Sequence, residues 1–135
     1  MDQKLMDKMI KKYPCVISSV NNDGYPEVRA MLNPRLVEDN KYFYFSTNTS
    51  STKIKQFKNN NKASVYFSDS KTYKGLLFVG EMEVLHDQDI KDKIWQFGDT
   101  IYYSKGVTDP DYCVLRFTAK KGRFYNNFKV IDFDI

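Results

Sequence analysis

Histidine, cysteine and glycine, which many enzyme sites require, are scarce in this chain. The sequence has one histidine, two cysteines and six glycines in 135 residues. Cys15 and Cys113 lie far apart in apolar runs and form no C-x-x-C pair, so we expect buried free thiols and no metal site. His86 stands alone, so it cannot build a histidine-based metal centre, and neither cysteine has the turn context of a nucleophile paired with it.

Motifs for catalysis by side chains are missing as well. The chain has no Gly-x-Ser-x-Gly turn, no glycine-rich phosphate loop and no carboxylate pair at an informative spacing. The sequence therefore names no catalytic residue. If the protein is an enzyme, we expect a cofactor to supply the chemistry.

Long apolar runs are also missing. No stretch approaches the length of a membrane span, and the N-terminus has no apolar signal region. We therefore expect a soluble, cytoplasmic protein. Lysine and arginine total 21 against 17 acidic residues, for a net charge of +4, and the lysines are scattered. That distribution is typical of a solvated basic surface rather than of a nucleic-acid site.

Aromatic residues, by contrast, are abundant, at 16% of the chain with ten tyrosines and ten phenylalanines. Such an excess favours sheets, in which rings pack across strands. The size fits one domain over residues 1–135. Apolar periodicity and turn residues predict helices at 2–13, 52–58 and 87–97, and strands at 15–20, 25–32, 41–46, 63–68, 74–85, 111–118, 124–128 and 131–135.

Two glycines shape the prediction of the later strands. Gly80 lies inside the strand predicted at 74–85 and indicates a bulge or sharp bend. Lys121-Gly122 is interpreted as the turn between the strands at 111–118 and 124–128. Because most of these strands follow one another as hairpins, the pattern predicts an antiparallel barrel with peripheral helices.

One segment points to a ligand. Residues 41–53 run from an aromatic strand into a cluster of hydroxyls and then into Lys53, which opens a short helix. Hydroxyls, free N–H groups, a helix N-terminus and a lysine are the donors that a phosphate group requires. Arg29, in a mostly apolar strand, could supply a second cation. The alternative is that the hydroxyls cap the helix, Lys53 is exposed, and Arg29 pairs with a nearby acid.

Several spaced motifs occur in a fixed order along the chain. They are Pro26-x-Val-Arg29-x-Met31, Phe45-Ser-Thr47-Asn-x-x-Ser51-Thr-Lys53, Ala63-Ser-Val-Tyr-Phe67 and Gly80-x-Met-x-Val84. Their combination resembles the flavin-binding split barrel of the pyridoxamine 5′-phosphate oxidase-like family, from about Ile10 to Leu85. The resemblance implies a mainly β fold, an antiparallel split β-barrel of Greek-key type with peripheral helices, and FMN as the cofactor.

The resemblance also implies roles for particular residues. In this family the arginine and lysine at the positions of Arg29 and Lys53 hold the FMN phosphate. The position of Thr52 often reaches the phosphate too, but it is arginine in the authentic oxidases, so one charge is missing here. The flavin and its ribityl chain would be lined by two residues after the aromatic strand and by backbone groups at the pyrimidine edge, namely Ser46, Thr47, Ala30 and Met31.

The family further implies a homodimer with FMN at the subunit interface and an undefined small-molecule substrate. Four rings of the 95–112 region, Trp95, Tyr102, Tyr103 and Tyr112, would either form the partner's wall of that site or pack the local core.

The chain ends at Phe133-Asp-Ile135 without the arginine–histidine substrate motif of the authentic oxidases, so pyridoxamine-phosphate oxidase activity is not expected. It looks more like the short general-stress and nitroimidazole-resistance-type members, although the placement of His86 does not support the active-site histidine of the latter. The resemblance implies an FMN-dependent oxidoreductase that takes electrons from a reduced nicotinamide. The alternatives are a non-catalytic flavin-binding or storage protein, and a barrel that binds single-stranded nucleic acid through its rings.

Overall fold

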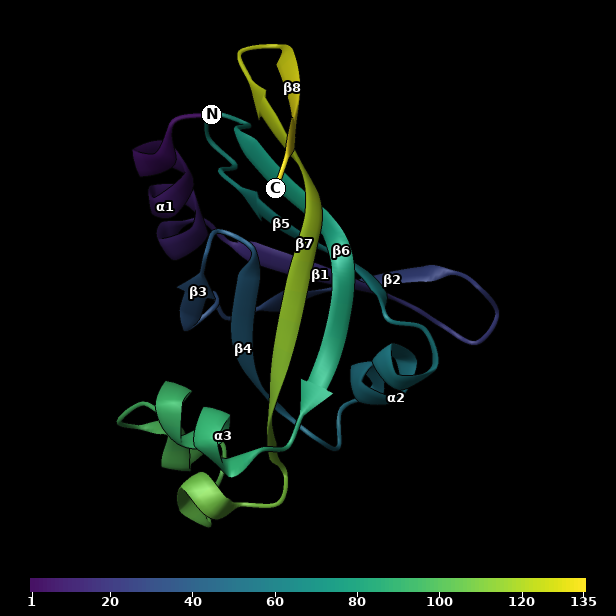
Figure 1. Ribbon diagram of the computed structural model, residues 1–135, viewed down its shortest axis with the longest axis vertical. Coiled ribbons are helices and arrows are strands. Elements are labelled where there is room, and N and C mark those ends of the chain that lie inside the picture. Colours follow the sequence, from purple (N-terminus) through teal and green to yellow (C-terminus); the bar gives the residue numbers. More distant parts are fainter.

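One antiparallel sheet of eight strands forms the frame of the molecule (Figure 1). The computed structural model describes the whole chain, Met1–Ile135. Seven strands lie in the order β2-β1-β5-β6-β7-β4-β3, and β8 pairs with β7. The strands are β1 (Cys15–Val20), β2 (Pro26–Met31), β3 (Leu36–Glu38), β4 (Tyr42–Asn48), β5 (Lys62–Ser68), β6 (Gly75–Leu85), β7 (Tyr112–Asn126) and β8 (Lys129–Asp134). Because β2 and β3 do not pair, the barrel is split, and the predicted fold class is confirmed.

Three short α-helices surround the sheet: α1 (Gln3–Lys12), α2 (Thr52–Asn59) and α3 (Gln88–Ile94). Asp2 caps α1 by accepting from the N–H of Lys4 at 3.1 Å, and the helix buries Met6, Met9 and Ile10, as the spacing predicts. In Figure 1, α2 lies beneath the β1–β2 hairpin, and α3 lies at the opposite end of the barrel from β8. No helix is long and apolar enough to cross a membrane.

Aromatic rings fill the barrel, as the composition predicts. A core cluster of 19 buried residues surrounds Phe43, which contacts Phe67, Phe78 and Phe117 with ring centroids 4.9–6.3 Å apart. Both Cys15 and Cys113 are buried free thiols in this cluster. The core thus fixes β4, whose end leads into the site described below.

Gly80 produces the predicted irregularity in β6. The register of β6 against β7 shifts between Val79 and Gly80. A Cβ at Gly80 would overlap the backbone carbonyl of Thr118. The glycine is therefore required because the neighbouring strand approaches too closely for any side chain.

The predicted turn at Lys121-Gly122 is wrong. β7 continues through both residues to Asn126, and the chain reverses at Asn127 and Phe128, whose φ values are 51° and 64°. Gly122 serves packing instead, because a Cβ there would overlap the ring of Phe133 from β8. A glycine that makes room for a cross-strand ring has the same sequence pattern as a turn glycine.

A buried ion pair organises the segment between α3 and β7. Arg35 donates to both carboxylate oxygens of Asp99, and through Nη1 to the carbonyl of Ile94 at 3.2 Å. The helix predicted at 87–97 ends at Ile94, since Trp95 adopts a φ of −60° and a ψ of 135°. Two 3₁₀ turns, Asp99–Ile101 and Gly106–Thr108, follow it before β7 begins.

Candidate functional site

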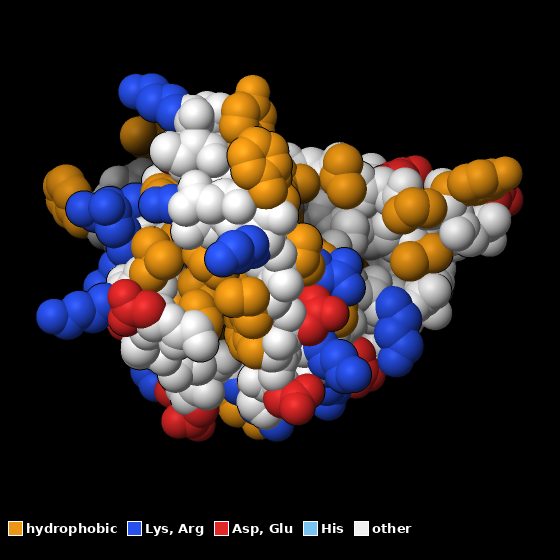
Figure 2. All heavy atoms as spheres, turned by 90° about the horizontal axis from the view of Figure 1, so that it is seen from above, with side chains coloured by type: hydrophobic (Ala, Val, Ile, Leu, Met, Phe, Trp, Pro, Cys, Tyr) orange, Lys and Arg blue, Asp and Glu red, His pale blue; other side chains and the backbone are white.

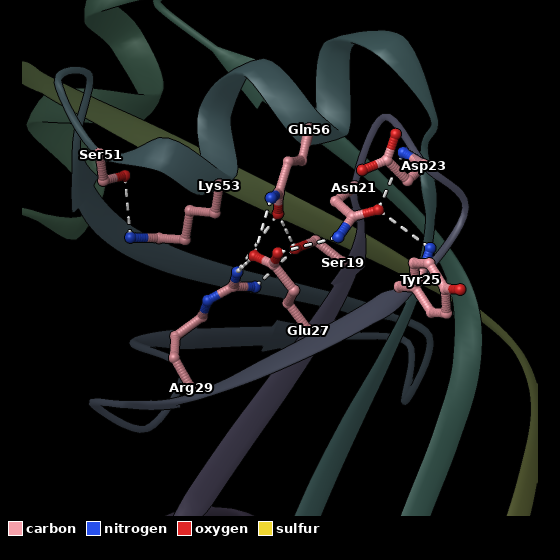
Figure 3. Close-up of polar contacts among 9 residues, drawn as sticks. All are labelled: Ser19, Asn21, Asp23, Tyr25, Glu27, Arg29, Ser51, Lys53 and Gln56. Carbon is pink, nitrogen blue, oxygen red and sulfur yellow. Dashed lines mark hydrogen bonds and ion pairs between the residues drawn. The ribbon is translucent and has the colours of Figure 1, made fainter.

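The two predicted phosphate-binding cations come from different elements and lie near one another. Arg29 is on the edge strand β2, and Lys53 is in the first turn of α2. Figure 3 shows both side chains in the space between that strand and that helix. Residues 24 apart in the sequence are therefore brought together by the packing of α2 beneath the β1–β2 hairpin.

Lys53 is buried and has no acidic partner. Its side chain is directed to Ser51, whose Oγ accepts from Nζ at 3.0 Å, and the residue is only 8% exposed. It takes part in none of the ion pairs of the structure. The alternative of an exposed lysine is therefore wrong, and this charge lacks the compensation that burial requires.

Ser51 occupies the N-cap position of α2 without capping it. Its hydroxyl donates to the carbonyl of Asn48 at 3.0 Å and accepts from Lys53, and no side chain bonds to the first N–H groups of the helix. The Ile54 N–H donates to the Ser51 carbonyl at 3.2 Å, which leaves the N–H groups of Thr52 and Lys53 to donate to an anion. The hydroxyl turn thus orients the lysine instead of closing the helix end.

Arg29 is fixed by three neighbours. Nη1 donates to Ser19 Oγ at 2.8 Å, Nη2 donates to Gln56 Oε1 at 3.3 Å, and the Glu27 carboxylate lies 3.8 Å from Nη2. The alternative of an arginine paired with a nearby acid is therefore partly correct. Glu27 is exposed, however, and at that distance it compensates the guanidinium only weakly.

The charges of the site are unbalanced. Burial lowers the pKa of Lys53, and the neighbouring Arg29 lowers it further. Burial also lowers the pKa of Arg29, while Glu27 raises it. Two neighbouring positive charges that are partly buried repel each other. A bound anion would neutralise them, so the arrangement indicates an anion-binding site.

A pocket of about 230 Å³ opens beside Lys53. Its lining residues are Ala30, Met31, Leu32, Ser46, Thr47, Asn48, Lys53, Tyr102 and Tyr103. Five of the seven predicted site residues therefore lie around one hollow. Arg29 is not one of the lining residues, but its side chain lies near Lys53 (Figure 3). The side chain of Thr52 is exposed and is not part of the lining.

Most rings of the 95–112 region pack a second core rather than a free surface. Tyr112 lies between Trp95 and Tyr103, with centroids 5.3 and 4.8 Å away. Tyr102 differs, because it is 63% exposed and lines the pocket together with Tyr103. Burial raises the pKa of Tyr103 to about 12, so its phenol is neutral and can donate a hydrogen bond at neutral pH.

Four larger hollows lie elsewhere, and three of them contain an arginine that pairs with an acid. A hollow of about 310 Å³ near β8 contains Arg123, whose Nε is 2.6 Å from the Asp132 carboxylate. Another, of about 460 Å³, contains Arg116, whose Nη2 is 2.9 Å from the Glu83 carboxylate. None of the four combines a buried lysine that has no acidic partner with a neighbouring arginine, so the charges favour the smaller pocket.

Sequence reasoning missed the residues that support Arg29. Ser19 is fully buried and continues the inward alternation of Cys15 and Ile17, and Gln56 shares the inward face of α2 with Lys53. The signal in the sequence that could have identified them is a polar residue at an inward-facing position of a strand or helix. His86, in contrast, is exposed just before α3 and contacts none of these groups.

Comparisons with known proteins identify the family of the chain. The family model described as "Pyridoxamine 5′-phosphate oxidase" matches residues 1–126. The chain belongs to this family. None of the curated proteins matches the sequence.

Solved structures of the pyridoxamine 5′-phosphate oxidase family share the fold. A Clostridium acetobutylicum protein, related to general stress protein 26 of Bacillus subtilis, has a TM-score of 0.87 and 36% identity, covering 100% of this chain and 97% of its own. General stress protein 26 of Bacillus anthracis gives 0.76 and 18%, covering 97% of each. A Nostoc punctiforme pyridoxamine 5′-phosphate oxidase-related, FMN-binding protein gives 0.69 and 14%, covering 96% and 90%.

Proposed function

We propose that the protein binds FMN and is an oxidoreductase that passes electrons from a reduced nicotinamide to a small substrate. The observation that supports it most is Lys53, a buried ammonium group without an acidic partner, next to Arg29. An FMN phosphate would supply the missing negative charge. The family membership of the chain and the FMN-binding Nostoc punctiforme neighbour support the same cofactor.

The residues present fit the chemical groups of FMN. Lys53, Arg29 and the uncapped first turn of α2 would bind the phosphate. Ser46 and Thr47 would meet the ribityl hydroxyls, and the backbone at Ala30 and Met31 would meet the polar edge of the ring. Bound FMN supplies the hydride and electron transfer that the side chains of this chain cannot perform.

We propose that the complete site needs a second copy of the chain. At about 230 Å³ the pocket is below the roughly 300–1,000 Å³ that encloses a small-molecule ligand. Next to the pocket, β2 exposes Val28 (70%), and Leu32 (59%), which directly follows β2, lines the pocket itself. Figure 2 shows hydrophobic side chains along the protruding arm at the right, which is the β1–β2 hairpin of Figure 1. A two-fold partner would cover this apolar edge and close the pocket.

A second candidate is a flavin carrier without catalysis of its own. The lining contains no histidine or carboxylate, and its titratable side chains are Lys53, Tyr102 and Tyr103. Because burial raises the pKa of Tyr103, this phenol is a weak proton donor. Anaerobic titration with NADH and NADPH separates the two candidates: loss of the yellow colour supports the oxidoreductase, and an unreduced flavin supports the carrier.

FMN binding itself is tested by the absorbance spectrum of the purified protein after FMN addition and removal of free ligand. We expect retained flavin absorbance, and a colourless protein would refute the proposal. The double variant Arg29→Ala/Lys53→Ala should weaken binding by several kcal/mol, since each charged hydrogen bond contributes about 1.5–3 kcal/mol.

The variant Val28→Lys should be monomeric in light scattering and bind FMN more weakly.

A further inference from the structure

The orientation of Arg29 depends on groups outside its own strand. β2 is an edge strand, and its arginine side chain has to bend toward α2 to reach the neighbourhood of Lys53. Two neutral oxygens accept from its terminal nitrogens, Ser19 Oγ at 2.8 Å and Gln56 Oε1 at 3.3 Å. These contacts leave the remaining guanidinium N–H groups free to donate to another ligand.

Both ends of the Gln56 amide are used, and this fixes its orientation. Oε1 accepts from the hydroxyl of Ser19 and from Arg29, while Nε2 donates to Glu27 Oε1 at 2.9 Å. A flipped amide would point its NH₂ group at Arg29 and its oxygen at the Glu27 carboxylate, and both of those hydrogen bonds would be lost. Gln56 is only 7% exposed, so water cannot easily replace these partners.

Glu27 is in turn fixed by the hairpin turn. Asn21 Nδ2 donates to Glu27 Oε2 at 3.0 Å, while Asn21 Oδ1 accepts from the N–H groups of Asp23 and Tyr25. Figure 3 shows the resulting series from the turn through Glu27 and Gln56 to Arg29. The hydrogen bonds of Gln56 lower the pKa of Glu27, as do those of Asn21, so the carboxylate stays ionised at neutral pH.

We propose that Gln56 is a positioning residue for phosphate recognition: it orients the Arg29 guanidinium beside Lys53 without neutralising it. A carboxylate at this place would hold the arginine equally well but would occupy its charge. An amide accepts the same hydrogen bond and leaves the positive charge for a phosphate. The exposed Glu27 carboxylate accepts from the amide at 2.9 Å and lies 3.8 Å from Arg29 Nη2, so it orients the amide and competes only weakly for Arg29.

The inference rests on the proposed function, and its test compares FMN with riboflavin, which lacks the phosphate. Quenching of flavin fluorescence gives both affinities for each variant. Gln56→Met retains the length of the side chain and removes both hydrogen-bonding ends. We expect its FMN affinity to fall roughly tenfold, the factor given by one hydrogen bond to a charged group, with riboflavin affinity unchanged. Gln3→Met on the exposed surface of α1 is the matched control and should change neither affinity.

Two further variants keep the test decisive if Gln56→Met folds poorly. Ser19→Ala removes the other acceptor of Arg29 and should also lower FMN affinity selectively. Glu27→Gln can keep the acceptor for Gln56 but removes the competing charge, so we expect FMN affinity to rise a few-fold. A merely structural network would instead lower the melting temperature and both flavin affinities together in all three variants.

Equal losses for FMN and riboflavin, or no loss for either, would overturn the role of Gln56 while leaving FMN binding intact. A fall in FMN affinity in Glu27→Gln would overturn the role given to its charge. A wild-type protein that binds neither flavin overturns the proposed function and this inference together.

Discussion

Arg29 on β2 and Lys53 on α2 are cations that lie near each other, and burial together with the Arg29 charge lowers the pKa of Lys53. Like charges placed together in a folded protein disfavour the folded state. The unliganded protein therefore loses some stability at this place, which is common where a site is preorganised for a ligand. The relationship leads directly to a prediction in which stability and binding change in opposite directions.

Lys53→Met should stabilise the unliganded protein and abolish its stabilisation by FMN. Methionine keeps the straight side chain in a position that is 8% exposed and removes the uncompensated charge, for a gain of about 1 kcal/mol. Without the ammonium group, FMN should bind at least tenfold more weakly. Thermal unfolding with and without FMN measures both effects. Lys55→Met on the exposed side of the same helix is the control, and a destabilised Lys53→Met variant would contradict the account.

Thr52→Arg should tighten FMN binding several-fold. Thr52 is the first residue of α2 and its side chain is exposed, so an arginine there can reach a phosphate without repacking the core. A further cation near the dianion adds a charge-assisted hydrogen bond, whereas riboflavin should gain nothing. Fluorescence titration at two salt concentrations provides the measurement.

The neutral variant Thr52→Gln separates charge from length at that position. It should bind FMN like the wild type, and the advantage of Thr52→Arg should shrink as salt rises. An equal gain in both variants, or a gain for riboflavin, would show that Thr52 does not face the phosphate.

The part of the site that the sequence predicts is the part built by local chemistry. An aromatic strand, a hydroxyl turn and a lysine follow one another within residues 41–53, so their common location needs no knowledge of the fold. The pairing of Gln56 with Ser19 and Arg29 depends instead on how α2 packs beneath the hairpin. Inward polar residues indicate that partners exist, but only tertiary structure identifies them.

The wrong prediction of a turn at Lys121-Gly122 has a similar cause. Gly122 and Gly80 are both single glycines inside strands, and both are explained by the close approach of a neighbouring group. The sequence pattern predicts a bulge at Gly80 and a turn at Lys121-Gly122, and only the first prediction is confirmed. The actual reversal at Asn127 and Phe128 has only a weak turn sequence, since Phe128 at φ 64° is an unusual choice there.

Asp99→Asn should destabilise the protein by about 3–5 kcal/mol at neutral pH. The side chains of Arg35 and Asp99 are 8% and 4% exposed, so removal of one charge leaves the other buried without a counter-ion. Trp95, the single tryptophan, packs on Tyr103 and Tyr112 beside this pair, so its emission reports on the segment. Asp89→Asn on exposed α3 is the control and should change little.

The same pair predicts an acid-sensitive region. Burial raises the pKa of Asp99, but hydrogen bonds from Arg35 and the Gln96 N–H outweigh it, so the pKa lies below its ordinary value of 3.8. A carboxyl group whose pKa is lower in the folded than in the unfolded protein stabilises the fold at any pH above its unfolded-state pKa. This stabilisation is lost as the pH falls through the folded-state pKa. Stability followed by Trp95 emission should therefore drop below about pH 4 in the wild type and drop less in Asp99→Asn. Equal acid sensitivity in both would contradict the assignment.

Gly80→Ala should destabilise the protein more than Gly75→Ala, although both glycines lie in β6. At Gly80 the new methyl group would overlap the carbonyl of Thr118, and only a shift of the β7 backbone could relieve it. At Gly75 the overlap is with the ring of Tyr66, which is 38% exposed and can rotate away. We expect a loss of at least about 2 kcal/mol for Gly80→Ala and of about 1 kcal/mol or less for Gly75→Ala in denaturant unfolding. A larger loss of stability for Gly75→Ala than for Gly80→Ala would contradict this account. It would mean that the β7 backbone can shift more easily than the Tyr66 ring can rotate, so that the bulge does not depend on Gly80.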